Sequence, residues 1–71
     1  MATVIQAPVH GTIVEVCVRM GDRVAEKQSL FIIELGKTLI TVRSTIAGRI
    51  ASLGVKTGDQ IERDAAAVTI E

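Results

Sequence analysis

The chain contains one pattern twice, and this internal duplication limits the folds open to it more than any other feature. Residues 7–34 align with residues 44–71 without a gap, at a constant offset of 37 positions. The identical pairs are Gly11/Gly48, Ile13/Ile50, Val18/Val55, Gly21/Gly58, Asp22/Asp59, Ile33/Ile70 and Glu34/Glu71. Two similar halves predict a fold with pseudo-twofold symmetry, in which equivalent residues pair across one core.

Both halves consist of short β-type segments separated by turns. The segments expected to be extended are residues 3–7, 12–19, 23–24, 30–34, 39–42, 49–55, 60–61 and 67–70. Val14, Val16 and Val18 alternate along the second segment and are expected to share one face. The repeated Gly-Asp steps predict structural turns, because glycine accepts positive φ and aspartate can bond nearby backbone. We expect an all-β sandwich or flattened barrel of about eight short strands.

Size and composition argue against several functions. Seventy-one residues allow one small domain, residues 1–71, which buries only about 60% of its unfolded surface. Phe31 is the only aromatic residue, so an enclosed substrate pocket is not expected, and neither is an independent enzyme. Eight Lys and Arg residues balance eight Asp and Glu residues, without the basic stripe or stacking aromatics of a nucleic-acid-binding protein.

The expected location is the cytoplasm. The single cysteine, Cys17, excludes an internal disulfide and fits a reducing compartment. The first residues lack the apolar stretch of a signal peptide, and no apolar run approaches the roughly 18 residues of a membrane span.

Lys37 lies in the connecting segment, residues 35–43, and has no counterpart in the other half. Gly36 beside it suits a tight hairpin, in which central positions often need positive φ. If the halves pack symmetrically, the terminal strands lie near one end of the fold and this hairpin lies at the other. Lys37 would then be an exposed amine at the tip. It is either an attachment point for a covalent group or an ordinary solvated turn lysine.

The remaining candidates indicate structural roles. His10 lacks neighbours with metal-ligand or acid–base spacing, and Cys17 lacks a sequence context that would lower its pKa. The serines Ser29, Ser44 and Ser52 have no nucleophile motif. Gly11 and Gly48 are expected where the backbone turns tightly or approaches another strand closely.

Taken in order, several short motifs resemble the biotinyl/lipoyl carrier domains across nearly the whole chain. They are Ala7-Pro8, Gly11-Thr12-Ile13, Gly21-Asp22 with Val24, Gln28 with Leu30, Ile33-Glu34 before Lys37, Val42-Arg43, Ala47-Gly48 and Gly58-Asp59 with Ile61. The opening and the Val42-Arg43 step look closer to the biotin carboxyl carrier branch. The hairpin reads Leu-Gly-Lys-Thr, unlike the usual Ala-Met-Lys-Met of biotinyl domains or Asp-Lys-Ala of lipoyl domains. Lys27 and Asp64 stand where the family often has glycine.

The resemblance implies both a fold and a function. The fold would be a barrel-sandwich hybrid of two four-stranded antiparallel sheets, with the attachment lysine at a hairpin tip. Biotin would be attached to Lys37, flanked by Gly36 and Thr38, as a swinging arm between a biotin carboxylase and a carboxyltransferase. A biotin protein ligase would attach it, and the domain would be a non-catalytic component of a multienzyme system. The alternatives are a lipoyl carrier with a lipoate ligase, or an unmodified binding or assembly module.

Overall fold

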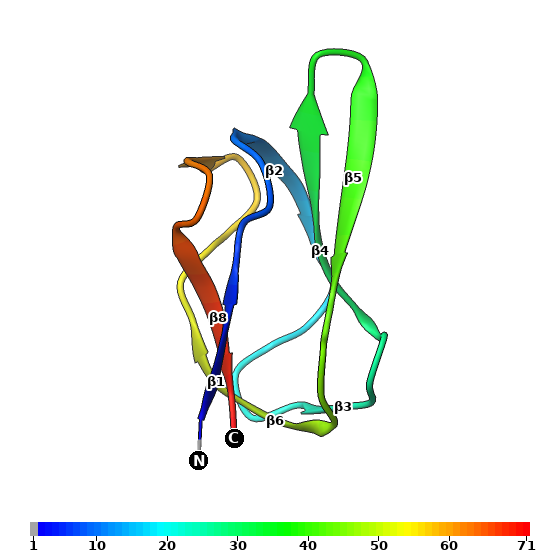
Figure 1. The fold of residues 1–71 in the computed structure, drawn as a ribbon, viewed down its shortest axis with the longest axis vertical. Helices are drawn as coiled ribbons and strands as arrows, with labels where there is room; N and C mark the ends of the chain where they lie inside the picture. Colours follow the sequence, from blue (N-terminus) through cyan, green and yellow to red (C-terminus); the bar gives the residue numbers. More distant parts are fainter. Residues whose placement is uncertain (1) are drawn as a thin grey trace.

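The computed structural model describes residues 2–71, and all regular structure in this range is β-strand. The strands are β1 (Thr3–Gln6), β2 (Gly11–Val16), β3 (Arg23–Val24), β4 (Ser29–Leu35), β5 (Thr38–Arg43), β6 (Gly48–Leu53), β7 (Gln60–Ile61) and β8 (Ala66–Ile70). They form two four-stranded antiparallel sheets, ordered β1-β8-β6-β3 and β5-β4-β2-β7 (Figure 1). The predicted all-β architecture is confirmed. The described part of the chain has no helix, and hence none that could cross a membrane.

The two sheets are related by a pseudo-twofold axis, as the duplication predicts. β6 repeats β2, and β7 repeats β3, each with the offset of 37 positions at both ends. The two halves also contact each other through equivalent backbone hydrogen bonds. The Gly21 N–H donates to the Ile50 carbonyl at 2.8 Å, and the equivalent Gly58 N–H donates to the Ile13 carbonyl at 2.7 Å. The equivalence extends beyond residues 7–34 and 44–71, because β1 corresponds to residues 40–43 of β5. Both sheets are therefore built on one plan.

The core lies between the sheets and is almost entirely aliphatic. Phe31, Ile33, Ile13 and Ile70 are fully buried and come from both sheets. β-branched side chains favour this arrangement, because they pack well on a pleated, half-buried surface. The complete buried set is Ile5, Ala7, Ile13, Val18, Val24, Leu30, Phe31, Ile33, Val42, Ile50, Val55, Ile61, Ala67, Val68 and Ile70.

The expectation that Val14, Val16 and Val18 share one face is wrong. Val18 is 4% exposed, but Val14 is 37% exposed, and Ile13 fills the core instead. The cause is a bulge, because the pairing of β2 with β4 shifts between Ile13 and Glu15 and leaves Val14 as the extra residue. β6 has the same irregularity against β8, at the equivalent position. The bulge thus belongs to the repeated plan.

Gly11 and Gly48 lie where two strands approach closely, as predicted. A Cβ at Gly48 would come within 3.0 Å of the backbone oxygen of Glu71 and 2.8 Å from Cγ2 of Ile70. A Cβ at Gly11 would meet the equivalent atoms of the other half, the Glu34 oxygen and the Ile33 side chain. Glycine is required at both positions because any side chain would displace the neighbouring backbone.

The Gly-Asp turns are also structural. Gly21 and Gly58 have φ of 86° and 97°, and the carboxylate of the following aspartate accepts a backbone N–H three residues back, at 2.9 Å from Arg19 and 3.1 Å from Lys56.

Lys27 and Asp64 adopt a left-handed backbone, with φ of 70° and 68°. These equivalent positions are the two at which the sequence departs from the glycine usual in similar domains. Glycine suits these two positions because it lacks the Cβ atom, which makes a left-handed backbone unfavourable for other residues. The departure leaves the turn geometry itself intact, as the Lys27 N–H still donates to the Ser44 carbonyl at 2.8 Å and the Asp64 N–H to the Ala7 carbonyl at 2.8 Å.

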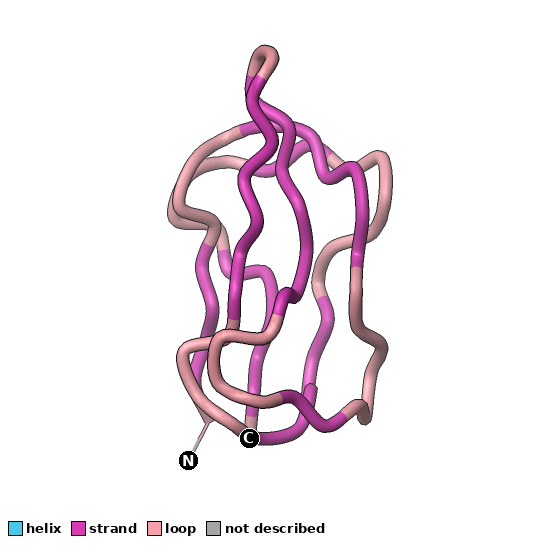
Figure 2. Tube along the Cα trace, turned by 90° about the vertical axis from the view of Figure 1, so that its right-hand side faces the viewer, coloured by secondary structure: helices cyan, strands magenta, loops and turns pink. Residues whose placement is uncertain are grey.

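The fold is elongated, measuring 33 × 17 × 17 Å along its principal axes. Both chain ends lie at one end of the long axis, and the hairpin of β4 and β5 lies at the other (Figure 1). Figure 2 shows the tip of this hairpin projecting beyond the neighbouring loops. The prediction that the terminal strands and the connecting hairpin lie at opposite ends of the fold is confirmed.

Candidate functional site

Lys37 occupies the second central position of the β4–β5 hairpin. Leu35 and Thr38 form the closing pair, so the loop has only two residues, Gly36 and Lys37. Gly36 has φ of 62°, while Lys37 is outside the left-handed region. Positive φ at the first central position alone matches a type II′ turn, whose twist suits the flanking strands. The local sequence therefore places the lysine, and not the glycine, at the position with ordinary φ.

The hairpin presents its amine to solvent. Gly36, Lys37 and Thr38 are all exposed, and the ladder between β4 and β5 holds the Cα of the lysine in place. The side chain beyond that Cα is a flexible four-carbon stem ending in three donors. This arrangement combines a rigid base with a mobile amine, which is what covalent attachment of a swinging group requires.

Of the three lysines in the chain, Lys37 alone lies on a projecting hairpin. Lys27 and Lys56 are also exposed, but each belongs to a loop whose backbone is bonded to the body of the domain. The Lys27 N–H donates to the Ser44 carbonyl, and in the loop of Lys56 the Gly58 N–H donates to the Ile13 carbonyl of β2. The structure thus fits a single protruding amine, although all three side chains reach water.

The two faces of the hairpin differ. Ile33 is fully buried, and its partner Ile40 is half-buried on the same, inward face. On the outward face, Glu34 pairs with Leu39, which is 63% exposed. Sequence reasoning treated Leu39 only as a strand residue. Alternation along β5, in which Ile40 and Val42 face inward, would have assigned Leu39 to the outer face, two residues after Lys37.

A shallow cavity of about 270 Å³ lies beside the turn end of β4. Its lining includes Gly36, Glu34, His10 and Glu62, which come from both halves of the chain. The sequence predicted a structural role for His10, without acid–base neighbours close in sequence, and the structure places it in the lining of the same cavity as Glu34 and Glu62. No group of three potential metal ligands is arranged to hold an ion anywhere in residues 2–71.

Cys17 and Ser44 have local roles in the structure. Cys17 is exposed, and its thiol donates to the Glu15 carboxylate at 3.6 Å. Desolvation, the negative charge of Glu15 and this hydrogen bond all raise the pKa of the Cys17 thiol, which lowers its thiolate fraction and its reactivity. Ser44 is buried, and its hydroxyl donates to the Ile46 carbonyl and accepts from the Ile46 N–H.

Substituting Gly36 tests whether the turn geometry holds the lysine. We expect Gly36→Ala to lower the free energy of unfolding by roughly 1–2 kcal/mol, because alanine resists positive φ. The loss should come from the backbone alone, since a Cβ at Gly36 meets nothing within 4 Å. Gly36→Asn, which tolerates such turns better, should lose less. Urea unfolding measures both, and an unchanged midpoint for Gly36→Ala would contradict the assigned turn.

Sequence comparison matches the chain to known proteins over almost its whole length. The biotin/lipoyl family, described as "Biotin-requiring enzyme", matches residues 1–70. The dihydrolipoyllysine-residue acetyltransferase component of the pyruvate dehydrogenase complex of Mycoplasma capricolum is 40% identical over 53 residues, which cover 75% of this chain and 12% of the relative. The biotin carboxyl carrier protein of Streptococcus mutans is 33% identical over 69 residues, which cover 97% of this chain and 53% of the relative. The chain therefore spans about half the length of the biotin carboxyl carrier protein and a much smaller part of the acetyltransferase component.

Structural comparison gives the same fold. The urea carboxylase of Kluyveromyces lactis superposes with a TM-score of 0.92 at 25% identity, over 100% of this chain and 6% of the carboxylase. A single-chain, multi-domain long-chain acyl-CoA carboxylase superposes with a TM-score of 0.89 at 20% identity, over 96% of this chain and 7% of that enzyme. At that identity, the second likeness concerns the fold alone.

Proposed function

The chain belongs to the biotin/lipoyl family, and on that premise we propose that it is a biotin carboxyl carrier domain with Lys37 as its attachment point. The observation that carries the proposal is the exposed Lys37 amine on a projecting two-residue turn, at the opposite end from both termini. That placement lets a tethered group move away from the domain at the end opposite to residues 3–6 and 66–70, which form β1 and β8.

The residues of the chain would serve to position the group. Gly36 and Thr38 would form the turn with Lys37, and the paired ends of β4 and β5 would carry this turn beyond the neighbouring loops. Biotin, bound as an amide on the amine, would supply the ring that carries a carboxyl group. The domain itself would be non-catalytic, because a tethered carrier raises the local concentration of its cargo at two active sites without binding either tightly.

The proposed partners follow from this role. They are a biotin protein ligase, a biotin carboxylase and a carboxyltransferase, in the cytoplasm. Two comparisons support the carboxylase association: the Streptococcus mutans relative is a biotin carboxyl carrier protein, and the structural neighbour at 25% identity is a urea carboxylase.

A lipoyl carrier is the second candidate. Its support is the relative with the higher identity, 40%, which is an acetyltransferase component of a pyruvate dehydrogenase complex. The same lysine and hairpin would serve, with a dithiolane in place of the biotin ring. The geometry favours neither group, since both need only an accessible amine on this turn.

Coexpression with each modifying enzyme in turn distinguishes these candidates. We expect one adduct in the intact mass after coexpression with a biotin ligase, and none after coexpression with a lipoate ligase. A lipoyl adduct alone would select the second candidate. The absence of both adducts from folded protein would reject a carrier role and favour an unmodified binding module.

A further inference from the structure

Leu39 is the most exposed large apolar side chain in residues 2–71. It is 63% exposed, compared with 61% for Met20, 51% for Val4 and 37% for Val14. A single exposed apolar side chain is ordinary on a protein surface. Leu39 is set apart by its position, because it lies two residues after Lys37 on the projecting hairpin (Figure 2).

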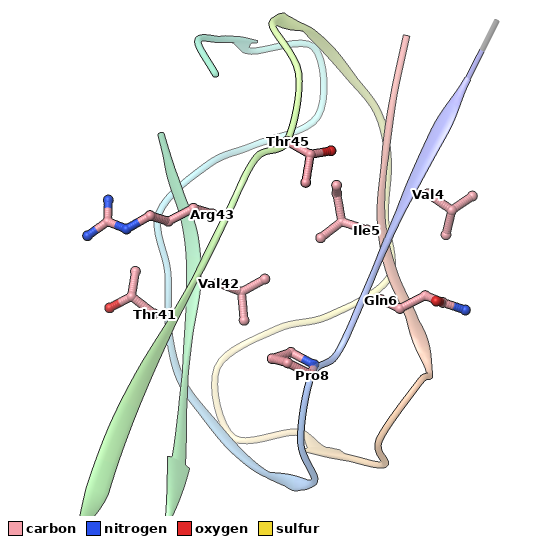
Figure 3. Close-up of a pocket in the computed structure, with 8 residues that line it drawn as sticks. All are labelled: Val4, Ile5, Gln6, Pro8, Thr41, Val42, Arg43 and Thr45. Atoms are coloured by element: carbon pink, nitrogen blue, oxygen red, sulfur yellow. The ribbon is translucent and has the colours of Figure 1, made fainter. Parts of the chain in front are cut away.

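The alternation of side chains along β5 turns Leu39 outward. Figure 3 shows Val42 pointing towards the other sheet, while Thr41 and Arg43 of the same strand point away from it. Leu39 lies two residues before Thr41, so its side chain is on the same outer face, opposite Glu34 of β4. The side chain therefore faces away from the core.

The fold does not require a large apolar residue at this position. The offset of 37 positions relates Leu39 to Ala2, so a small side chain satisfies the same plan in the other half. The next outward positions of β5 are Thr41 and Arg43, which are polar. Strand positions that face solvent are usually polar, because apolar surface is less favourable in water. The choice of leucine thus indicates a role outside the packing of the domain.

The rest of the turn offers little surface for recognition. Gly36 has no side chain, Thr38 is small, and Leu35 is half-buried. Burial of apolar surface is the main favourable term in most protein association. Among residues 35–39, Leu39 is therefore the one large apolar side chain that is mostly open to a partner.

An enzyme that acts on the Lys37 amine must come close to Leu39. A lysine side chain reaches only roughly 6 Å beyond its Cα, the span of five single bonds, and Cα atoms two residues apart are separated by at most about 7 Å. An active site that encloses the amine therefore also meets the strand beside the turn. Enzymes that act on the far end of an attached group work further from the backbone and need not touch this strand.

We propose that Leu39 is a recognition residue for the enzyme that modifies Lys37, and that its side chain enters an apolar depression of that enzyme beside the amine. The inference rests on the proposed carrier function, and it adds the residue that makes this hairpin a substrate. The contact forms when the domain binds and does not change as the amide bond forms. Its loss therefore raises the KM for the domain and leaves kcat unchanged.

Initial rates of modification test this role. The purified domain is incubated with a biotin protein ligase, biotin and ATP, and the adduct is measured by intact mass over a range of domain concentrations. We expect Leu39→Thr to raise the KM about 5- to 20-fold, because most of the apolar surface of the side chain is lost, with kcat within about twofold. Leu39→Met keeps an apolar side chain of similar size and should stay within about twofold of the unsubstituted domain in both constants.

Met20→Thr is the matched control at a distant exposed position. Met20 is 61% exposed and precedes Gly21, which is bonded to Ile50 near the end of the fold that holds both termini. This variant should be modified at the rate of the unsubstituted domain. Urea unfolding verifies that each variant folds. Leu39→Ala, with the same expected rise in KM, takes the place of Leu39→Thr if that variant does not fold.

The outcomes separate this inference from the function on which it rests. If only a lipoate ligase forms an adduct, the same variants are compared with that enzyme. The absence of an adduct with either ligase on the folded, unsubstituted domain rejects the carrier function and the inference with it. Unchanged kinetics for Leu39→Thr, or equal losses in Leu39→Thr and Met20→Thr, overturn the inference alone. A loss in kcat alone, or no recovery in Leu39→Met, also overturns it, because neither result fits apolar recognition.

Discussion

Replacing Lys37 with arginine is expected to abolish covalent modification completely while leaving the fold unchanged. Amide formation needs an amine that can lose its proton, whereas the guanidinium of arginine stays protonated in proteins. The substitution keeps the positive charge and the length of the side chain. Because Lys37 is exposed, we expect a change of less than about 0.5 kcal/mol in the free energy of unfolding. Intact mass after coexpression with the ligase measures the loss, and urea unfolding verifies the fold.

The other two lysines provide matched controls for this experiment. Lys27→Arg and Lys56→Arg make the same chemical change at exposed positions elsewhere on the surface. Both variants should carry the same single adduct as the unsubstituted protein. An adduct that persists in Lys37→Arg but disappears in one of the controls would assign the attachment point to another lysine. The argument from the hairpin would then be incorrect.

Replacing Gly48 with alanine is expected to produce the largest loss of stability among these variants. The new Cβ would collide with the Glu71 backbone oxygen and with Cγ2 of Ile70, where Ile70 ends β8 and Glu71 is bonded through its backbone to Arg49 of β6. Overpacking of this kind costs typically about 1–3 kcal/mol, and more where backbone has to move. We expect a loss of about 3 kcal/mol. A chain of this size has a total stability of only about 4–11 kcal/mol. The midpoint of thermal unfolding should therefore fall by on the order of 15 °C.

Gly54→Ala is the control for Gly48→Ala, because it is the same change six residues further along the chain. There a Cβ would lie 3.3 Å from the Ala67 carbonyl oxygen, a tight contact that a small shift relieves. We expect a loss of less than about 1 kcal/mol. Gly11→Ala should behave like Gly48→Ala, because the two glycines are equivalent in the duplication. A small loss for Gly48→Ala, or equal losses for Gly48→Ala and Gly54→Ala, would show that the close approach does not constrain the fold.

Much of the architecture could be predicted because the duplication makes each half a check on the other. The short strands at residues 23–24 and 60–61 were placed with the correct bounds, since each is held between a Gly-Asp turn and a polar loop. The exposed position of Lys37 followed from the same symmetry, because a residue between two related halves must lie at the opposite end from the termini. Its role as an attachment point stays a prediction.

The bulge at Val14 could not be predicted in this way. Strict alternation of Val14, Val16 and Val18 is a local pattern, whereas a bulge arises from how β2 pairs with β4. The left-handed backbone at Lys27 and Asp64 escaped prediction for a similar reason. Neither residue type favours positive φ as glycine does, so only the surrounding hydrogen bonds show why both positions adopt it.

The sequence by itself determined the symmetry of this protein, its strands, its glycine turns and the position of one amine outside the repeat. These features follow from residue spacing and backbone preference, which act over short stretches of chain. Only the tertiary structure decided which side chain enters the core beside the bulge, and that His10 lines the same cavity as Glu34 and Glu62. Both depend on contacts between segments distant in sequence, because register and the separation of two sheets arise only when the halves pack together.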